Sequence, residues 1–369
     1  MALTNFAALT NEEKTAWSMD LWRHARNYSF MNQFTGTGPN SMIQRITELK
    51  KTEKGARAVI TLLADLEGDG VAGDRTLEGN EEAMQTNDQV IRVDQLRHAN
   101  RHEGRVADQK SIVNFRENSR DVLAYWLADR MDQMAFQTLG GFSYALNPDG
   151  TARVGSALSS LEFAADVTAP TSQRFARWNA QTAGSEVLEV GNGTNTIVAG
   201  DVISWETLVR MREKAKNGYI RGLRPQGGMD ELFHVFMTPT TMANLKMDND
   251  YMLNLRHSTS AGTNSKLFGA GTVMVDGLVL HEFRHVPHSA TWGVGADVPG
   301  SAVLMCGAQS LAFADIGNPV WVEKYFDYDN QPGISVAKMA GFLKPQFRNI
   351  YAGNTVQDHG VFVTYVSDA

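Results

Sequence analysis

The chain has 369 residues, a formal net charge of −7 and a hydrophobic content of 43%. Its length exceeds that of an ordinary single domain, so we expect one elaborated domain or two domains that share a long element. An acidic chain lacks the basic surface that would coat nucleic acid by charge. No apolar run approaches the ~18 residues of a membrane span and no signal-peptide core is visible, so we expect a protein made and kept in the cytosol.

The first part of the chain is predicted to be an arm followed by a long hairpin. Residues 1–55 mix short helical pieces with polar turns, which is typical of an arm laid over another element. Residues 56–64 are rich in β-branched side chains and residues 89–96 alternate apolar with polar, so we expect two paired strands in a hairpin over 56–96. The acidic, glycine-rich segment between them far exceeds the roughly two to five residues that usually close a hairpin. Such an excursion normally serves a contact or a site.

A long amphipathic helix is predicted over residues 108–139. Its apolar side chains recur at steps of three and four or their multiples, and they include Ile112, Phe115, Val122, Trp126 and Phe136. Asp108 suits the N-cap, and Gly140 with Gly141 supplies the left-handed residue that ends a helix. About 32 residues make a rod of roughly 48 Å. A rod of that length would project beyond a compact core unless sheets lie along it.

The rest of the chain is predicted to complete a mixed α+β body. Residues 142–201 are rich in loops, and the sequence does not order their parts. We expect a helix from Ser204 to about Lys216, a buried strand at 233–237, a helix after Thr238 and a hairpin over 273–280. Mostly short strands and turns are expected from residue 302 onward. The only cysteine, Cys306, excludes an intrachain disulfide and is predicted to be a buried, inert thiol.

One stretch has the residues of a catalytic motif but not the secondary structure that the motif requires. His281, Glu282 and His285 fit the H-E-x-x-H pattern of zinc peptidases, which requires a helix so that two imidazoles reach one metal. Here the stretch continues a strand, and four residues of extended chain span roughly 13 Å. Two ligands that each lie ~2.0–2.1 Å from one zinc ion must be much closer together. We therefore predict no metal site, and a zinc peptidase with Glu282 as base is the alternative from the enzyme class.

No other catalytic apparatus is visible. The segment 65–70 resembles the start of an EF-hand loop, but Thr76 stands where the bidentate glutamate belongs. The sequence holds no Walker P-loop, no G-x-S-x-G and no dinucleotide-binding fingerprint after a strand. We therefore predict no catalytic residues, no cofactor and no enzymatic activity.

Four long and unusual stretches point to one family. They are GPNSMIQRI at 38–46, ADLEGDGVAGD at 64–74, DQLRHANR at 94–101 and FDYDN at 326–330. Together with the order of the predicted elements, they resemble the major capsid proteins of tailed phages with the HK-97 fold, and in detail the N-4-type coat proteins. The likeness covers nearly the whole chain. It implies an α+β, HK-97-like fold with the following parts: an N-terminal arm over 1–55, an E-loop hairpin over 56–96, a P-domain over 97–202 with the spine helix 108–139, an A-domain over 203–330, and C-terminal strands over 331–369 that return to the P-domain.

The resemblance also implies a function. It indicates a major capsid subunit that forms hexamers and pentamers of an icosahedral shell and encloses double-stranded DNA without sequence-specific binding. The protein would then belong to the virion, be assembled in the host cytoplasm, and have scaffold, portal and decoration proteins as partners. A non-viral compartment shell of the same fold is a second alternative.

The acidic tip of the hairpin is predicted to contact neighbouring subunits. It carries Glu67, Asp69, Asp74 and Glu78 with a single basic residue, Arg75, and has too few large apolar side chains to bury itself. Basic residues cluster instead at the hairpin base and before the helix. In a neighbouring copy we expect these partners to be Arg97, Arg101, Arg105 and Lys110.

Overall fold

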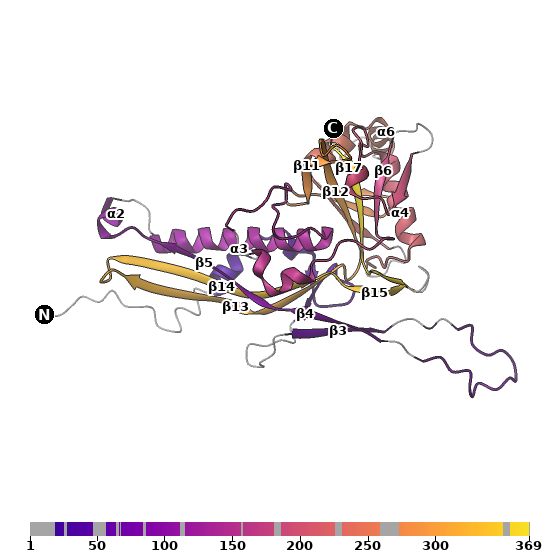
Figure 1. Ribbon diagram of the computed structural model, residues 1–369, viewed down its shortest axis with the longest axis horizontal. Coiled ribbons are helices and arrows are strands. Elements are labelled where there is room, and N and C mark those ends of the chain that lie inside the picture. The colour runs from indigo at the N-terminus through magenta and orange to yellow at the C-terminus, as the bar shows by residue number, and fades with distance from the viewer. Residues whose placement is uncertain are drawn as a thin grey trace.

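The computed structural model describes residues 19–25, 28–46, 57–63, 66, 68–83, 86–110, 115–155, 158–180, 186–225, 231–258, 273–349 and 355–368. The molecule is elongated, with a narrow half built along helix α3 (Phe115–Gly140) and a thicker half at the other end (Figure 1). The described helices include none that is long and apolar enough to cross a membrane.

The narrow half is a five-stranded sheet that lies along α3. Its strand order is β1-β2-β13-β14-β5. The strands are β1 (Thr35–Gly36), β2 (Ile43–Ile46), β13 (Leu311–Phe326), β14 (Gln331–Leu343) and β5 (Asp94–Arg101). Trp126 of α3 stacks on His98 of β5 with ring centroids 4.5 Å apart, and Leu127 joins the core formed with Ile334 and Val336 of β14. The sheet that the predicted rod required is therefore present.

The predicted spine helix begins too early in the chain. Asp108 lies inside a separate short helix, α2 (Arg105–Lys110), which points away from the axis of α3 (Figure 1). The 26 residues of α3 make a rod of about 39 Å instead of ~48 Å. The intervening Ser111, Ile112, Val113 and Asn114 lie outside the described residues, and all four rank low in helix propensity. The predicted end, at Gly140 and Gly141, is confirmed, with Gly141 at a φ of 72°.

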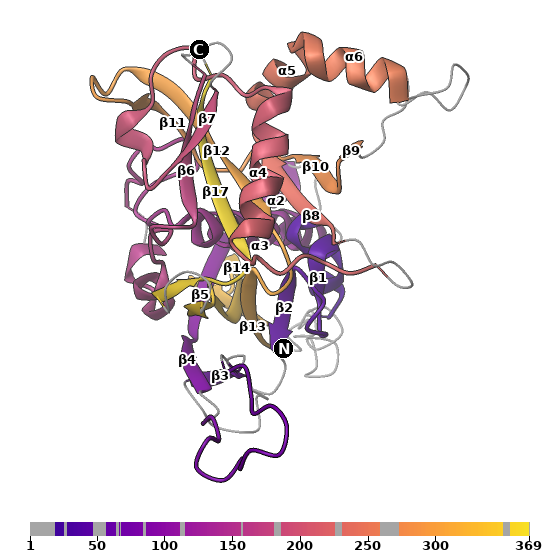
Figure 2. The ribbon, with the colours of Figure 1, turned by 90° about the vertical axis from the view of Figure 1, so that its right-hand side faces the viewer.

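The thicker half is an eight-stranded sheet with helices on one face. Its order is β7-β6-β17-β12-β8-β10-β9, and β11 pairs with β12. The strands are β6 (Phe175–Asn179), β7 (Val187–Val190), β8 (Phe233–Met237), β9 (Val273–Val275), β10 (Leu278–Glu282), β11 (His288–Trp292), β12 (Val298–Cys306) and β17 (Val361–Ser367). Figure 2 shows α4 (Trp205–Asn217) crossing the sheet, where Leu208 and Met211 pack with Val235 and Val303. Two further helices, α5 (Pro239–Met247) and α6 (Asn249–Ser258), lie at its edge.

Several local predictions in this half are confirmed. α4 begins directly after Ser204, and α5 begins after Thr238, whose hydroxyl accepts from the N–H of Thr241 (3.3 Å). β8 occupies residues 233–237, and β9 pairs with β10 across Asp276-Gly277, both with positive φ. Cys306 is fully buried.

Sheet membership crosses the domain boundaries that the resemblance implies. β6 and β7, predicted to lie in the P-domain (97–202), belong to the eight-stranded sheet, whereas β13, from the predicted A-domain (203–330), belongs to the narrow half. The predicted C-terminal segment 331–369 divides between β14 in one sheet and β17 in the other. The strands after residue 302 are long instead of short, since β13 runs from Leu311 to Phe326. Gly317, Asn318 and Pro319 are turn-forming residues that suggest a break, whereas β13 passes through them with a shift in its register to β14.

The hairpin of β3 (Arg57–Leu63) and β4 (Thr86–Arg92) lies against the sheet face opposite α3. The predicted pairing is confirmed, with Arg57 opposite Arg92 and Leu63 opposite Thr86, but the hairpin ends at Arg92 and not at 96. Its Ile91 packs against Ala312, Ala314 and Leu343. The alternate side chain Phe313 points to the α3 side of the same sheet.

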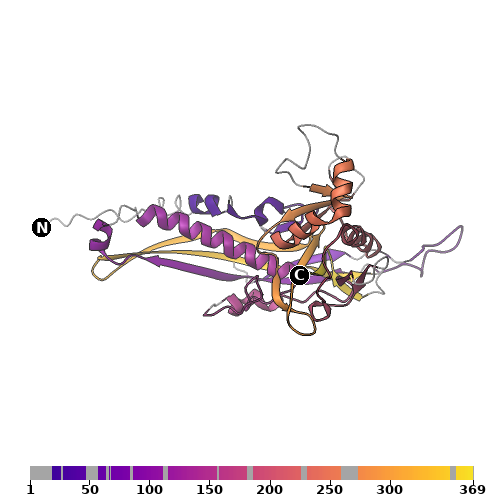
Figure 3. The ribbon, with the colours of Figure 1, turned by 90° about the horizontal axis from the view of Figure 1, so that it is seen from above.

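The arm crosses α3 and joins the two halves. Figure 3 shows it beside α3, and its 3-10 helix η1 (Met31–Phe34) leads into β1 and β2. The buried Asp132 of α3 accepts hydrogen bonds from Ser29 Oγ (2.7 Å) and from the N–H groups of Phe30 (2.8 Å) and Met31 (3.1 Å). Phe30 also stacks on Phe283 with ring centroids 4.2 Å apart.

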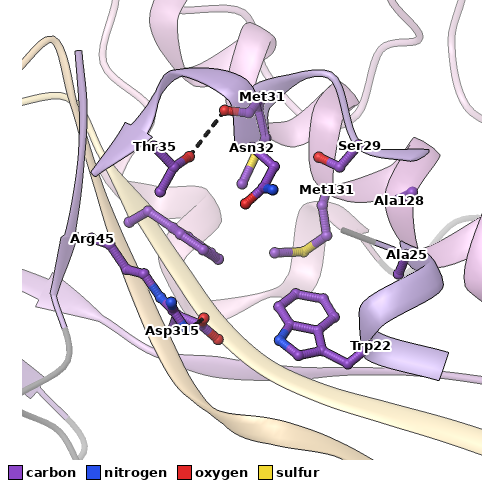
Figure 4. Close-up of a pocket in the computed structure, with 11 residues that line it drawn as sticks. Trp22, Ala25, Ser29, Met31, Asn32, Thr35, Arg45, Ala128, Met131 and Asp315 are labelled. Atoms are coloured by element: carbon purple, nitrogen blue, oxygen red, sulfur yellow. Dashed lines mark hydrogen bonds and ion pairs between the residues drawn. The ribbon is translucent and has the colours of Figure 1, made fainter. Parts of the chain in front are cut away.

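Beneath the arm lies a small cavity of about 20 Å³, shown in Figure 4. Trp22, Met131 and Phe313 line it, and so does the ion pair of Arg45 with Asp315. Space of this size holds at most one water molecule. The arm is therefore packed onto the body and leaves no ligand site there.

The remaining described elements are short connections. They are η2 (Leu158–Ser160), η3 (Glu162–Asp166), η4 (Thr194–Thr196), β15 (Gln346–Asn349) and β16 (Thr355–Asp358). β15 and β16 form a two-stranded sheet beside the base of the hairpin, where Gln89 Nε2 donates to the carbonyl oxygen of Gln346 (2.6 Å).

Candidate inter-subunit surfaces

Among the described residues, nothing covers the face of the five-stranded sheet opposite α3 beyond the hairpin, and we call it the open face. On β5 the side chains of Leu96, His98 and Asn100 point to α3, since Asn100 donates to Ser119 Oγ (3.2 Å) and His98 stacks on Trp126. Arg97 and Arg101 therefore point to the open face. Both are exposed.

The strand register extends this face across three strands. Arg97 lies opposite Ala337 of β14, which lies opposite Val320 of β13. Arg101, Gly333 and Lys324 form a second such row. Directly opposed residues of antiparallel strands share a face. The cationic side chains of Arg97, Arg101 and Lys324 therefore lie on one face, beside small residues. None of the side chains just named is acidic.

The loop that closes the hairpin carries the opposite charge. Between 68 and 83, every residue except Val71 is exposed. Asp69, Asp74 and Glu78 are among them, and Leu77 is 60% exposed. Hydrogen bonds hold the loop to itself, as where Gly68 N–H donates to Glu82 Oε2 (2.7 Å). The loop thus offers carboxylates and an apolar side chain to something outside its own chain.

The structure places the predicted contact residues in two separate groups. Asp69, Asp74 and Glu78 lie on the loop at one end of the molecule, while Arg105 and Lys110 lie in α2 at the other end (Figure 1). Glu67 lies outside the described residues. The two groups do not meet within one chain.

Some of the predicted basic residues also have partners in their own chain, and sequence reasoning missed one cation. The Arg101 guanidinium lies 4.5 Å from the ring centroid of Phe326, and that of Arg105 donates to the carbonyl oxygen of Asp329 (3.3 Å). Lys324 was missed because β13 was not predicted as one long strand. Residues two apart on a strand share a face, so a strand over 320–326 places Lys324 beside Val322, although the sequence there does not alternate apolar with polar.

The H-E-x-x-H stretch is not a helix, but only its first half is extended as predicted: His281 and Glu282 end β10, and Arg284 and His285 form a turn. The two histidines have different partners. His281 Nε2 lies 2.8 Å from His234 Nδ1 on the neighbouring strand β8, whereas His285 Nε2 lies 2.6 Å from Asp129 Oδ1 of α3. Glu282 pairs with Lys246 at 3.6 Å. Within the described part of the chain, no group of three or more histidine, cysteine or acidic side chains is placed to hold a metal ion.

Local environment sets the titration of these groups. Burial lowers the pKa of both His234 and His281 to about 4, and for His281 the neighbouring His234 adds to the effect. The hydrogen bond from His285 lowers the pKa of Asp129. Such pKa shifts accompany structural packing as well as catalysis. Neither His234 nor His281 lines the cavity beneath the arm.

The subunit is elongated, with an acidic projection at one end and a basic face toward the other, and such complementary surfaces suit contacts between copies. The fold and its surfaces therefore define a self-assembling structural subunit. The model of the family described as "Phage capsid protein" matches residues 5–368. The chain belongs to this phage capsid family.

A relative and several solved structures agree with this assignment. The chain is 56% identical to the major capsid protein of Pseudomonas phage KPP25 over 99% of its own length and 97% of that protein. The capsid of Ralstonia phage GP4 superposes with a TM-score of 0.73 at 22% identity, covering 92% of this chain and 91% of that one. The cyanophage Pam1 capsid gives 0.70 at 17% identity, covering 100% and 96%. The fold is the HK-97-like capsid fold, and the protein is a structural component of a phage virion.

Neither alternative from the sequence is supported. The family match covers the His281–His285 stretch with the rest of the chain, and its description is of a phage shell and not of a peptidase or a cellular compartment.

Proposed function

We propose that this chain forms hexamers and pentamers that close into an icosahedral shell around double-stranded DNA, in which the loop of one subunit lies on the open face of the next. Assembly takes place in the host cytoplasm, with scaffold, portal and decoration proteins as partners. The subunit itself has no enzymatic activity. The observation that carries the proposal is the placement of the acidic loop and the basic open face on the same side of the sheet.

This placement makes a head-to-tail contact geometrically simple. Ile91 anchors the hairpin on the side of β14 that carries Leu343, and the same side carries Met339 and Ala337 farther along the strand. The loop projects past the thick half, away from α2 (Figure 1). A second copy shifted along the long axis would lay its loop across Arg97, Arg101 and Lys324.

Each such contact is weak, and repetition makes it effective. One exposed ion pair contributes only ~0–1 kcal/mol, and salt screens it. Every subunit of a shell gives one loop and receives one, so these small free-energy contributions are repeated at each contact. Assembly should therefore be more sensitive to salt than folding is.

Electron microscopy and charge reversal test the proposal together. Purified wild-type protein should form particles tens of nanometres across, and a preparation that stays monomeric under all conditions would refute the shell function. Replacing Asp69, Asp74 and Glu78 by lysine should abolish closed particles while leaving the circular dichroism spectrum and melting temperature nearly unchanged. Replacing Arg97 and Lys324 by glutamate should do the same.

The decisive variant carries both sets of replacements in one chain. It restores opposite charges at every loop-to-face contact, so particles should return. Normal particle yield and salt tolerance in either single-set variant would show that the loop does not lie on this face. The neutral replacement Gln95→Ala on the same strand controls for substitutions that leave the charge of the face unchanged.

A further inference from the structure

One side chain at the base of the hairpin bonds β4 to β15. Gln89 lies on β4, and its carboxamide makes two hydrogen bonds to the backbone of Gln346, the first residue of β15. Its Nε2 donates to the carbonyl oxygen (2.6 Å), and its Oε1 accepts from the N–H (3.0 Å). A carboxamide offers both a donor and an acceptor, so it binds this backbone as a neighbouring strand would. Neither bond involves the side chain of Gln346.

The side chain of Gln346 extends this connection into the body. Its Nε2 donates to Oδ1 of Asp358, a fully buried residue (2.8 Å). The other carboxylate oxygen of Asp358 lies 3.0 Å from Lys344 Nζ, which is buried too. The carbonyl oxygen of Asp358 accepts from Arg174 Nε (2.9 Å). Removing one partner of a buried charge leaves that charge uncompensated, so Asp358 is firmly held to these neighbours.

The residues around Asp358 stand where strands of the two sheets begin and end. Lys344 follows β14 of the narrow half directly, whereas Arg174 precedes β6 and Asp358 lies shortly before β17 in the thicker half. The N–H of Val363 in β17 donates to the carbonyl oxygen of Arg174 (2.9 Å). A displacement of Asp358 is therefore felt at the first residues of both β6 and β17.

The small sheet of β15 and β16 lies between the hairpin and the thicker half (Figure 1). At the end of β15 away from Gln346, Asn349 Nδ2 donates to the carbonyl oxygen of Gly218, which directly follows α4 (3.1 Å). Two strands alone are at best marginally stable. The position of this small sheet therefore depends on its bonds to the hairpin on one side and to the thicker half on the other.

We propose that Gln346 couples the hairpin to the thicker half, so that holding the loop changes the local stability at the starts of β6 and β17. The loop is held when it lies on a neighbouring subunit, and in this respect the inference rests on the function proposed above. The hydrogen bonds from Gln89 to Gln346 and from Gln346 to Asp358 supply a continuous network for this coupling. Coupling is reciprocal, so the thicker half also influences the hairpin.

Hydrogen exchange of the unassembled subunit tests the coupling without a shell. Gln89→Ala removes both bonds to β15 at a partly buried site, so the fold should persist. We expect amide exchange to become roughly fivefold faster or more in residues 361–367 of the other sheet, as well as in the hairpin. Asp88→Ala, at an exposed position on the opposite face of β4, is the matched control and should leave residues 361–367 unchanged. Faster exchange confined to the hairpin would overturn the proposal.

A second substitution distinguishes this coupling from a general loosening. Gln346→Ala keeps the two backbone groups that Gln89 binds but removes the bond to Asp358. Adding Gln89→Ala to that variant should speed exchange in the hairpin and cause no further change in residues 361–367. An undiminished effect there would overturn the role of Gln346. Gln346→Asn is measured in parallel, because its amide is too short to reach Asp358 and its polar side chain disturbs the fold least.

The results for the coupling and for the shell are separable. Failure of the wild type to form particles refutes the shell function, while hydrogen exchange still reports the coupling within one subunit. Normal particles from the wild type, together with unchanged exchange in residues 361–367 of Gln89→Ala, refute only the coupling.

Discussion

Asp132 shows how a single buried residue fixes the arm to the body. Its carboxylate lies at the start of η1 and accepts three hydrogen bonds from residues 29–31. Two of the donors are backbone N–H groups, which have no partner inside the helix at its N-terminal end. An amide in its place would turn an N–H donor toward other donors.

Asp132→Asn should therefore lower the free energy of unfolding by about 1–3 kcal/mol and expose the arm. Urea unfolding measures the first effect, and limited proteolysis between residues 19 and 36 measures the second. Asp121→Asn is the control, because Asp121 forms a partly exposed pair with Arg120 that should contribute less than about 1 kcal/mol. Equal effects of the two variants would show that the arm does not depend on Asp132.

Three partly buried histidines give the stability a defined pH dependence. Burial lowers the pKa of His234, His281 and His359 to about 4, against 6.5 for an ordinary histidine. Between these values the unfolded chain binds more protons than the folded one. The contribution of these histidines to the free energy of unfolding is therefore fully present above about pH 6.5 and is lost as the pH drops toward 4.

The urea midpoint should decrease steadily from about pH 7 to about pH 4.5, and His359→Gln should flatten that decrease. The Nε2 atom of His359 has no hydrogen-bond partner in the described part of the chain, so its replacement breaks no such bond. A slope that is identical in the wild type and His359→Gln would contradict this account.

At the scale of elements, close approach fixes the hairpin on the sheet. A Cβ atom on Gly341 of β14 would fall against the carbonyl oxygen of Arg92, at the end of β4. Only glycine lets the two backbones lie this near.

Gly341→Ala should displace the end of β4 and lower stability by roughly 1–3 kcal/mol. It should also lower particle yield, because the loop then leaves the body at another angle. Thermal unfolding and electron microscopy measure the two effects. Gly38 has open space around it, so Gly38→Ala should change neither. A Gly341→Ala variant with normal stability would show that β4 can move without cost.

Sequence reasoning succeeded for elements with local signals and failed where partners are distant. The N-caps Ser204 and Thr238, the Asp276-Gly277 turn and the strand 233–237 are each specified by a few neighbouring residues. The apolar spacing that predicted one helix over 108–139 does not reveal that α2 points away from the axis of α3. β17 is buried along its whole length between β6 and β12, so nothing near it in sequence reveals its sheet. Of the candidate site, the acidic loop was predictable from composition, whereas Lys324 required the register of β13.

At the scale of the whole molecule, the net charge limits the affinity of the subunit for DNA. With a net charge of −7, an isolated subunit has few cations free to release counterions from DNA. Fluorescence anisotropy with a labelled duplex should show binding no tighter than roughly micromolar at physiological salt, weakening as salt rises. Tighter binding would mean that one face concentrates positive charge enough to overcome the total.

The central position of β17 has a consequence for synthesis on the ribosome. Strand β12 pairs with β8 on one side and with β17 on the other, although residues 361–367 are translated long after Phe233–Met237. The thicker half therefore stays without its middle strand until residues 361–367 have been made. The hairpin and α3 also pack on β13 and β14, so they too depend on segments that are made late. We expect the body to fold only after most of the chain is synthesised, which leaves early segments dependent on chaperones during translation.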